Sequence, residues 1–194
     1  MSSLAALLNY SATSAIAYLL SIYMQVIQGY SSQTAGLVMI AQPIVMAVLT
    51  PKMGKMSDKH SPFKLSSLGM CFCAVGILMF LFINKETEIV YIIGALAVTG
   101  LGFAFFSSPN TNAILSCVEK KDYGAANAVV STMRSIGQAA GMVIVTIVVS
   151  FMLPGTQLEQ AEPEKLLEVI RISFIIFAVL CVVGIFISLL RKKK

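Results

Sequence analysis

Long apolar runs, separated by short segments that hold most of the charged residues, set the pattern of this 194-residue chain. The runs are continuously apolar and of bilayer length, which is typical of membrane-spanning helices, whereas strands of a membrane barrel would alternate apolar and polar residues. We expect one domain over residues 1–194. The pattern predicts an all-α membrane protein with six transmembrane helices, at about residues 4–27, 34–51, 65–83, 89–116, 124–152 and 169–190.

The first apolar run is long enough for two crossings of a bilayer. No charged residue precedes Lys52, whereas one crossing of a roughly 30 Å hydrocarbon core needs only about 20 residues. Within that run, residues 29–33 combine a glycine with small polar residues, which is typical of a turn followed by a helix N-cap. The run therefore divides there into the first two spans.

Composition and charge support the same class of protein. Hydrophobic residues make up 57% of the chain and charged residues 12%, and the mean hydropathy is +0.86. Basic residues favour cytoplasmic loops. With the tail at residues 191–194 in the cytoplasm, ten of the 14 lysines and arginines fall on that side and six of the nine acidic residues on the other. We expect a multi-pass plasma-membrane protein with both termini cytoplasmic, and the charge pattern does not favour a nucleic-acid partner.

A basic segment with a single acid, between the second and third spans, carries the most distinctive motif. Gly54 lets two helix ends approach closely, and Asp58, one turn later, can accept hydrogen bonds from a helix N-terminus. Lys59 and Lys64 would hold the segment at the cytoplasmic headgroups. Two interpretations stay open: a loop that couples moving helices, and an ordinary cytoplasmic turn in which Asp58 caps the third span.

The segment Gly54-x-x-Ser57-Asp58-Lys59, followed by Lys64, resembles the loop motif between the second and third helices of each six-helix half of the major facilitator superfamily. The loop departs from that motif at residues 61–63, where serine, proline and phenylalanine replace a glycine and basic residues. Further residues resemble the C-terminal half of the multidrug:proton antiporter branch (EmrB/QacA type, fourteen spans): Tyr23-Met24-Gln25, Gly29-Tyr30-Ser31, Gly100-Leu101-Gly102, Pro109, Tyr123-Gly124-Ala125-Ala126-Asn127, Arg134, Gly137 and Gly141.

The resemblance implies a secondary active transporter, embedded in the lipid bilayer, that exports lipophilic or cationic drugs out of the cell by alternating access, in exchange for protons. It implies that the chain is one half of a major-facilitator-type bundle. The partner would be an N-terminal half, supplied upstream in the same gene, by a separate chain, or by a second copy in a homodimer. No Asp or Glu lies in the middle of a predicted span, so this chain offers no candidate for the proton-coupling carboxylate.

The superfamily lines its central cavity with the first and fourth helices of each half. The resemblance therefore places a set of side chains toward a small-molecule substrate: Tyr10, Ser14, Phe103, Phe106 and Asn110, with Gln42 nearby on the second helix. Phe103, Phe106 and Asn110 are three and four residues apart and share one helix face. Such an aromatic surface suits lipophilic compounds, and it equally suits helix packing.

Arg134 is the one strong charge deep in a predicted span. An arginine near the centre of a membrane helix costs roughly 2.5–3.5 kcal/mol on insertion scales. Two roles stay open for it: packing or snorkelling toward the cytoplasmic surface, and a place in a gate or substrate pathway.

Small residues predict close helix contacts, and one proline predicts a kink. Gly137 and Gly141 lie on one helix face, and Gly100 begins a second row of small residues spaced four apart, with Gly102 beside it. Pro109 removes one backbone hydrogen bond from the fourth span, so it serves as a pivot or is simply tolerated in a buried helix.

The sequence disfavours an enzyme. His60 is the single histidine, and neither a nucleophile motif, a pair of acids within a span nor a metal-ligand cluster is present. We therefore expect no cofactor and no metal. Two alternatives to drug export stay open: a truncated, non-transporting membrane scaffold, and a facilitator-family transporter of another small solute.

Overall fold

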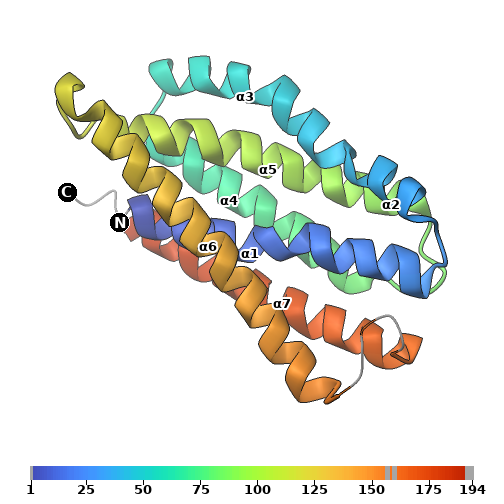
Figure 1. Ribbon diagram of the computed structural model, residues 1–194. Coiled ribbons are helices and arrows are strands. Elements are labelled where there is room, and N and C mark those ends of the chain that lie inside the picture. Colours follow the sequence, from blue (N-terminus) through green and yellow to red (C-terminus); the bar gives the residue numbers. More distant parts are fainter. Residues whose placement is uncertain (1, 156–157, 159–160, 191–194) are drawn as a thin grey trace.

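The computed structural model describes residues 2–155, 158 and 161–190 (Figure 1). Six helical stretches in the described part of the chain are long and apolar enough to cross a membrane, so the predicted fold class is confirmed. α1 begins and α7 ends at the same end of the bundle, as an even number of crossings requires (Figure 1). The elements are α1 (Ser2–Ile22), the π-helix η1 (Tyr23–Ile27), α2 (Ser32–Met39), α3 (Ala41–Lys59), α4 (Pro62–Met79), the 3₁₀ turn η2 (Phe80–Phe82), α5 (Ile89–Leu115), the 3₁₀ turn η3 (Lys120–Asp122), α6 (Tyr123–Met152) and α7 (Pro163–Leu190).

The turn between α1 and α2 lies where the sequence predicts it. Gly29 has a φ of +69°, a left-handed conformation that an ordinary side chain would oppose. Ser31 is the N-cap of α2, and its hydroxyl oxygen accepts a hydrogen bond of 3.2 Å from the backbone N–H of Thr34. The predicted turn and N-cap are confirmed. The basic tail at residues 191–194, on which the orientation partly rests, lies outside the described residues.

The second crossing is longer than the expected span of 34–51. α2 and α3 together run from Ser32 to Lys59, with a short interruption at Ile40. α3 continues through Pro51, and the neighbouring Thr50 hydroxyl donates a hydrogen bond of 2.6 Å to the Met46 carbonyl oxygen. Hydroxyl groups of this kind help membrane helices tolerate an internal proline.

The segment predicted as a cytoplasmic loop is largely helical. Gly54, Asp58 and Lys59 lie on α3, Lys64 lies on α4, and only residues 60–61 connect the two helices. This prediction is wrong because glycine, a loop signal in soluble proteins, is common where membrane helices touch. The motif therefore occupies the end of one helix and the beginning of the next.

The break between α3 and α4 is set by Pro62, the first residue of α4. A residue before a proline avoids the helical region, and Ser61 has a ψ of 114°. Ser61 is the N-cap position of α4, and no side chain there supplies a cap hydrogen bond. Asp58 therefore does not cap this helix, in contrast to one of the two interpretations of the sequence.

The last helix also differs from its expected span of 169–190. α7 begins at Pro163, and its first turns contain the charged residues Glu164 and Lys165. Hydropathy places these residues outside a span, but Leu166 beside them is almost fully buried in the bundle. Apolar packing therefore extends the helix beyond its apolar run.

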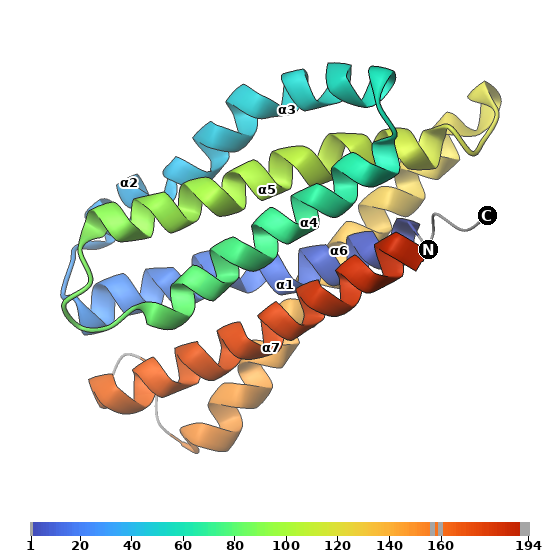
Figure 2. The same cartoon turned by 180° about the vertical axis from the view of Figure 1, so that it is seen from behind.

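The helices pack in a fixed order around α1. α1 lies against α6 and α7, α4 lies against α5 and α7, and α3 lies against α5 (Figures 1 and 2). The main apolar core joins α1, α4, α5 and α7, and it contains the ring of Phe80 stacked on that of Phe174 with centroids 5.2 Å apart. This order leaves α3 and α6 at the edges of the bundle.

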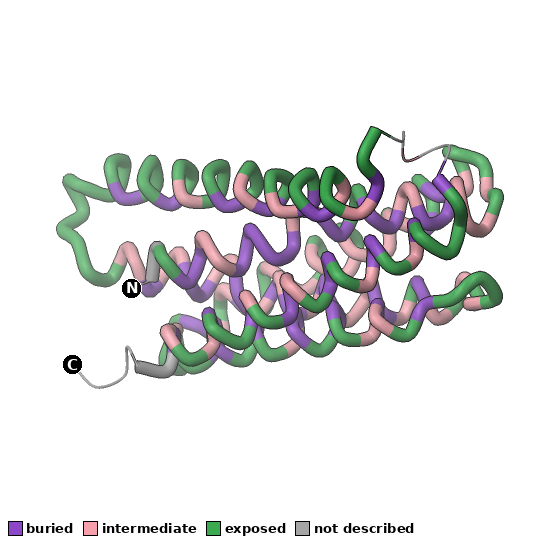
Figure 3. The backbone as a smooth tube through the Cα atoms, turned by 90° about the horizontal axis from the view of Figure 1, so that it is seen from below, coloured by how far each residue is buried: buried purple, intermediate pink, exposed green. Residues whose placement is uncertain are grey.

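α3 and α6 are also the least covered crossings. Only 11% of the most apolar part of Ser32–Lys59 is buried. The buried share is 22% in the corresponding part of Lys120–Met152, but it is 61% in that of Leu4–Ile27. Buried residues gather on the inward sides of the helices, and exposed residues run along the outer sides (Figure 3). Two helix surfaces of this bundle are therefore free to contact lipid, water or another protein.

The exposed surface of α6 is not uniformly apolar. Ser131, Ser135 and Gln138 are all exposed and follow one another at helical spacings of four and three. We call these three residues the polar face of α6. Because the hydrocarbon core offers no hydrogen-bonding partner, a polar face of this kind favours contact with water or protein over contact with lipid tails.

The end of the bundle away from Ser2 is held by side-chain bonds to the connection between η2 and α5. The Tyr23 hydroxyl donates a hydrogen bond of 2.5 Å to the Asn84 carbonyl oxygen. Arg171 on α7 donates one of 3.0 Å to the Ile83 carbonyl oxygen. The Arg171 bond is charge-assisted and therefore stronger than a neutral one, so this end of the bundle is well fixed.

Candidate functional site

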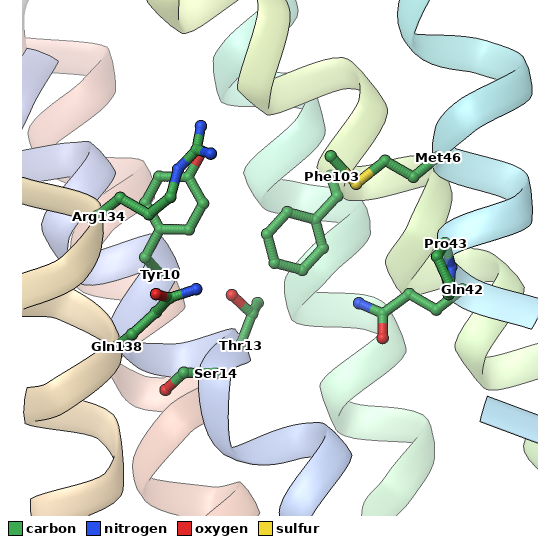
Figure 4. A pocket seen from close by; sticks show the side chains of 9 residues that line it. All are labelled: Tyr10, Thr13, Ser14, Gln42, Pro43, Met46, Phe103, Arg134 and Gln138. Atoms are coloured by element: carbon green, nitrogen blue, oxygen red, sulfur yellow. The ribbon is translucent and has the colours of Figure 1, made fainter. Parts of the chain in front are cut away.

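A cavity of about 340 Å³ lies between α1, α3, α5 and α6. Pro43, Arg134 and Gln138 in its lining are exposed, so the cavity opens on the side that α3 and α6 flank. Figure 4 shows the side chains that line it: Tyr10, Thr13 and Ser14 from α1, Gln42, Pro43 and Met46 from α3, Phe103 from α5, and Arg134 and Gln138 from α6.

Aromatic rings form the wall between α1 and α5. The Tyr10 ring lies 6.1 Å from the Phe103 ring at an interplanar angle of 37°, and it meets the Phe106 ring edge-on at 6.0 Å and 76°. The Tyr10 hydroxyl also donates a hydrogen bond of 3.5 Å to the Ser107 hydroxyl. These contacts fix the orientation of Tyr10, which is itself almost fully buried.

Arg134 extends from α6 across the Tyr10 ring. Its guanidinium carbon lies 4.9 Å from the centre of the ring, which is within the range of a cation–π interaction (Figure 4). Within the described residues, no acidic side chain forms an ion pair with Arg134. The positive charge therefore has no acidic partner among the described residues, at the edge of the cavity.

Glycines bring the helices close enough to form these walls. A Cβ atom on Gly137 would lie 2.6 Å from the Leu7 carbonyl oxygen, and one on Gly141 would overlap Ser11 and Ser14. α6 therefore lies directly against the backbone of α1, which places Arg134 beside Tyr10.

Two glycines of α5 bring α3 and α4 equally close to α5. A Cβ atom on Gly100 would lie 2.6 Å from the Gln42 carbonyl oxygen, so α3 is held against α5 beside the cavity. A Cβ atom on Gly102 would lie 2.5 Å from the Cys73 backbone nitrogen, where α4 packs on the opposite side. Pro109 is buried in α5, which continues as one helix from Ile89 to Leu115.

The structure brings together five of the side chains that the sequence places along a pathway: Tyr10, Ser14, Gln42, Phe103 and Arg134. Phe106 and Asn110 do not line the cavity, because α5 turns them inward and leaves them 1% and 2% exposed. Sharing a helix face with Phe103 was therefore not enough to place them at the cavity. Phe106 instead supports the Tyr10 ring from behind.

Four lining residues were missed by sequence reasoning: Thr13, Pro43, Met46 and Gln138. Three of them follow a predicted pathway residue by three or four positions, as Gln138 follows Arg134. That spacing places two residues on one helix face, so it could have identified them. Pro43 has no comparable signal, since it depends on how α3 continues after the interruption at Ile40.

A second cavity, of about 320 Å³, lies at the end of the bundle where α3 meets α4. The Ser57 hydroxyl in its lining donates a hydrogen bond of 2.7 Å to the Gly54 carbonyl oxygen and accepts one of 2.6 Å from the Asn112 amide. A Cβ atom on Gly54 would lie 3.0 Å from the Ser108 hydroxyl oxygen, so the end of α3 is packed closely on α5.

Asp58 lines this second cavity together with Tyr123, the first residue of α6. In the described structure Asp58 makes no ion pair, and its side chain is exposed, as are those of Lys59 and Lys64. Of the charged residues of the motif, Asp58 thus borders the open space between α3, α4, α5 and α6, and Lys59 and Lys64 are not part of its lining.

Comparison with known proteins identifies the family of this chain. The family model of the Major Facilitator Superfamily matches residues 2–194, so the chain belongs to that superfamily. The chain is 24% identical over 180 residues to the riboflavin transporter RibZ of Clostridioides difficile, which covers 93% of this chain and 40% of RibZ.

Two further relatives are named for drug resistance. The multidrug resistance protein Stp of Mycobacterium tuberculosis is 25% identical over 145 residues, covering 73% of this chain and 27% of Stp. The multidrug efflux pump LfrA of Mycolicibacterium smegmatis is 29% identical over 124 residues, covering 64% of this chain and 25% of LfrA. The chain thus spans less than half the length of these relatives, and it is a multi-pass membrane protein of a transporter family.

Proposed function

We propose that the chain is the C-terminal half of a secondary active transporter, and that it exports small lipophilic compounds by alternating access in exchange for protons. The observation that carries this proposal is the cavity of about 340 Å³ between α1, α3, α5 and α6. It combines aromatic walls with a few hydrogen-bonding groups, which is the usual composition of a small-molecule site. Two relatives with multidrug names support export of drugs over other transport functions.

A second half would complete this cavity. The cavity opens between α3 and α6, the two helices that the bundle covers least, and the polar face of α6 borders the same opening. A partner half that packs against both helices would close the cavity and remove Ser131 and Ser135 from lipid. Such a half would come from the same gene, from a separate chain or from a second copy of this one.

Alternating access then requires the two halves to rock around the cavity. The segment from Gly54 to Lys64 is well placed to set the balance between the two orientations, because it connects the ends of α3 and α4 beside the beginning of α6. No acidic residue occurs in the middle of a crossing within the described residues, so the proton-coupling carboxylate belongs to the partner half.

A second candidate function is transport of a different small solute. The riboflavin transporter RibZ covers 93% of this chain, and the cavity includes the amides of Gln42 and Gln138 and the hydroxyls of Thr13 and Ser14. These groups can hydrogen-bond a polar solute. This candidate shares the alternating-access mechanism and differs only in what the cavity holds.

Transport by inside-out membrane vesicles tests the proposed function. Vesicles from cells that express the chain with its genomic upstream segment are energised by an inwardly acidic pH gradient. Uptake of the neutral lipophilic dye N-phenyl-1-naphthylamine should follow the gradient and stop when a protonophore collapses it. Dye uptake equal to that of vesicles without the protein, despite full membrane insertion, would reject drug export. Gradient-driven riboflavin uptake in the same vesicles would support the second candidate.

A further inference from the structure

We infer that Arg134 is a substrate-binding group, and that the cavity selects planar aromatic anions over cations of the same shape. This inference rests on the proposed function and deepens it, because it names the charge class of the substrate. It differs from the expectation from the family resemblance, which included cationic drugs.

Among the described residues that line the cavity, Arg134 alone is charged. The other lining side chains are neutral, and no acidic side chain pairs with Arg134 in the described part of the chain. A cation in this space would meet the guanidinium charge without any carboxylate of this half to offset it. An anion would meet its opposite charge, and the attraction would strengthen once a partner half closes the open side of the cavity to bulk water.

The position of Arg134 along α6 supports a functional role. It lies 11 residues after Tyr123, the first residue of α6, which corresponds to about 16 Å along a helix axis. α6 has 30 residues and is about 45 Å long, so a roughly 30 Å hydrocarbon core centred on it would contain Arg134, on the Tyr123 side of its middle. Ionisable residues at such depths usually face a cavity or a partner and mark a pathway, since the bilayer opposes them.

The contact with Tyr10 leaves the guanidinium available to a ligand. The guanidinium uses one face against the Tyr10 ring, at 4.9 Å, whereas its N–H donors point outward in the plane of the group. Carboxylate and sulfonate oxygens can accept two such donors at once, which gives Arg both strength and orientation as an anion-binding residue. In Figure 4 the guanidinium lies beside the Tyr10 ring at one end of the lining, with Gln138 below it.

The remaining walls favour a flat ring system. The Phe103 ring stands near that of Tyr10, and Pro43 and Met46 lie across the cavity on α3 (Figure 4). Aromatic and thioether side chains pack well on planar rings. The volume of about 340 Å³ lies at the lower end of the range of small-molecule sites, which is roughly 300–1,000 Å³. An aromatic anion would therefore stack its rings near Phe103 and direct its charge toward Arg134.

Two dyes with the same xanthene ring system separate the effect of charge from that of shape. Fluorescein is an anion and rhodamine 123 is a cation at neutral to mildly basic pH. Their binding to the purified protein, in the form in which the cell encodes it, is measured by fluorescence anisotropy in lipid nanodiscs without a gradient. We expect fluorescein to bind at least about tenfold more tightly than rhodamine 123, because one charge-assisted hydrogen bond changes a dissociation constant by about that factor.

Substitutions then assign the preference to Arg134. Arg134→Gln should weaken fluorescein binding at least about tenfold and strengthen rhodamine 123 binding, and Arg134→Lys should give an intermediate loss because a lysine cannot form the two-pronged contact. Lys120→Gln, which removes a positive charge just before α6 and outside the cavity, should bind both dyes like the unmodified protein.

A second variant keeps the inference testable if Arg134→Gln does not fold. Gln138→Glu places an acid one turn from Arg134, at the spacing of a helical ion pair, and should shift the preference toward rhodamine 123. Four results would each overturn the inference: equal losses of affinity for both dyes in Arg134→Gln, an unchanged preference in Gln138→Glu, tight rhodamine 123 binding by the unmodified protein, or binding of neither dye. Tight rhodamine 123 binding would result if a carboxylate of the partner half neutralised Arg134. Failure of the proposed function would be seen separately, as absence of gradient-driven uptake in vesicles.

Discussion

Asn112 on α5 donates a hydrogen bond of 2.6 Å to the hydroxyl of Ser57 on α3, and Ser57 in turn bonds the Gly54 carbonyl oxygen of its own helix. Ser57 is buried, whereas Asn112 is half-buried, and both residues line the second cavity. The bond therefore links the end of α3, which carries the charged motif, to a helix that lines the central cavity.

Loss of this bond should destabilise the protein measurably. Ser57→Ala leaves the Asn112 amide without its partner, and we expect a loss of about 1–3 kcal/mol in the free energy of unfolding. The double variant Ser57→Ala, Asn112→Ala should lose less than the sum of the two single variants, because both remove the same bond. Thermal unfolding in detergent measures these differences.

Ser116→Ala is a matched control for this prediction. The Ser116 hydroxyl donates only to the Ala113 carbonyl oxygen of its own turn, so its removal breaks no contact between helices. We expect a change of less than about 0.5 kcal/mol, which is usual for surface positions. Strictly additive losses in the double variant would show that the Ser57 and Asn112 side chains do not interact.

The approach of α6 to α1 provides a second prediction. Gly137→Ala adds a methyl group 2.6 Å from the Leu7 carbonyl oxygen, so the two helices must separate. Overpacking of this kind typically costs about 1–3 kcal/mol, and it should also lower transport because Arg134 moves relative to Tyr10. Gly124→Ala, on the same helix, is the control, since a Cβ atom there meets nothing within 4 Å. Equal stability of the two variants would contradict the close contact.

The sequence predicted the class of fold and the number of crossings because both depend on apolar length, which a bilayer enforces along the whole chain. The boundaries near charged residues could not be predicted in this way. Lys52, Lys55 and Lys59 are charged and yet helical, because the backbone continues its hydrogen bonds beyond the hydrocarbon core until Pro62 ends the pattern.

The residues of the site also divide into those that helical spacing predicts and those whose position depends on how the helices pack. Helical spacing relates Gln138 to Arg134, but it cannot decide which side of α5 faces the cavity. Phe103 and Phe106 look equivalent in the sequence, and both rings contact Tyr10. Only the packing of α4 on α5, as at Gly102, separates them, since Phe106 is buried and Phe103 lines the cavity. The polar face of α6 was equally hidden, since its exposure depends on which helices cover α6.

That polar face leads to a third prediction, on cysteine labelling. In a variant whose four native cysteines are alanine, we introduce Ser135→Cys or Ile136→Cys. Both positions are exposed on α6, one on the polar face and one beside it on the apolar surface. A water-soluble maleimide should label Ser135→Cys at least about tenfold faster, because only a hydrated thiol ionises and reacts. Equal rates would show that Ser135 is no more hydrated than Ile136, whether lipid or a packed partner half covers it.

The last prediction concerns the charged motif where α3 ends and α4 begins. Asp58 lines the second cavity opposite Tyr123, where α6 begins, and the partial positive charge of a helix N-terminus attracts an anion. If this attraction stabilises one of two orientations of the halves, Asp58→Asn should shift their balance by about 1 kcal/mol or more, which is about a fivefold change in population. We expect a several-fold lower rate of gradient-driven N-phenyl-1-naphthylamine uptake in vesicles, with unchanged thermal stability, since Asp58 is exposed and makes no ion pair in the described structure.

Glu119→Gln is the control, because it removes another exposed acid at the same end, paired only with Lys121. Uptake by Asp58→Asn at the rate of the unmodified protein would show that the motif does not set the balance, and the Ser57–Asn112 bond would then remain as the link between α3 and α5.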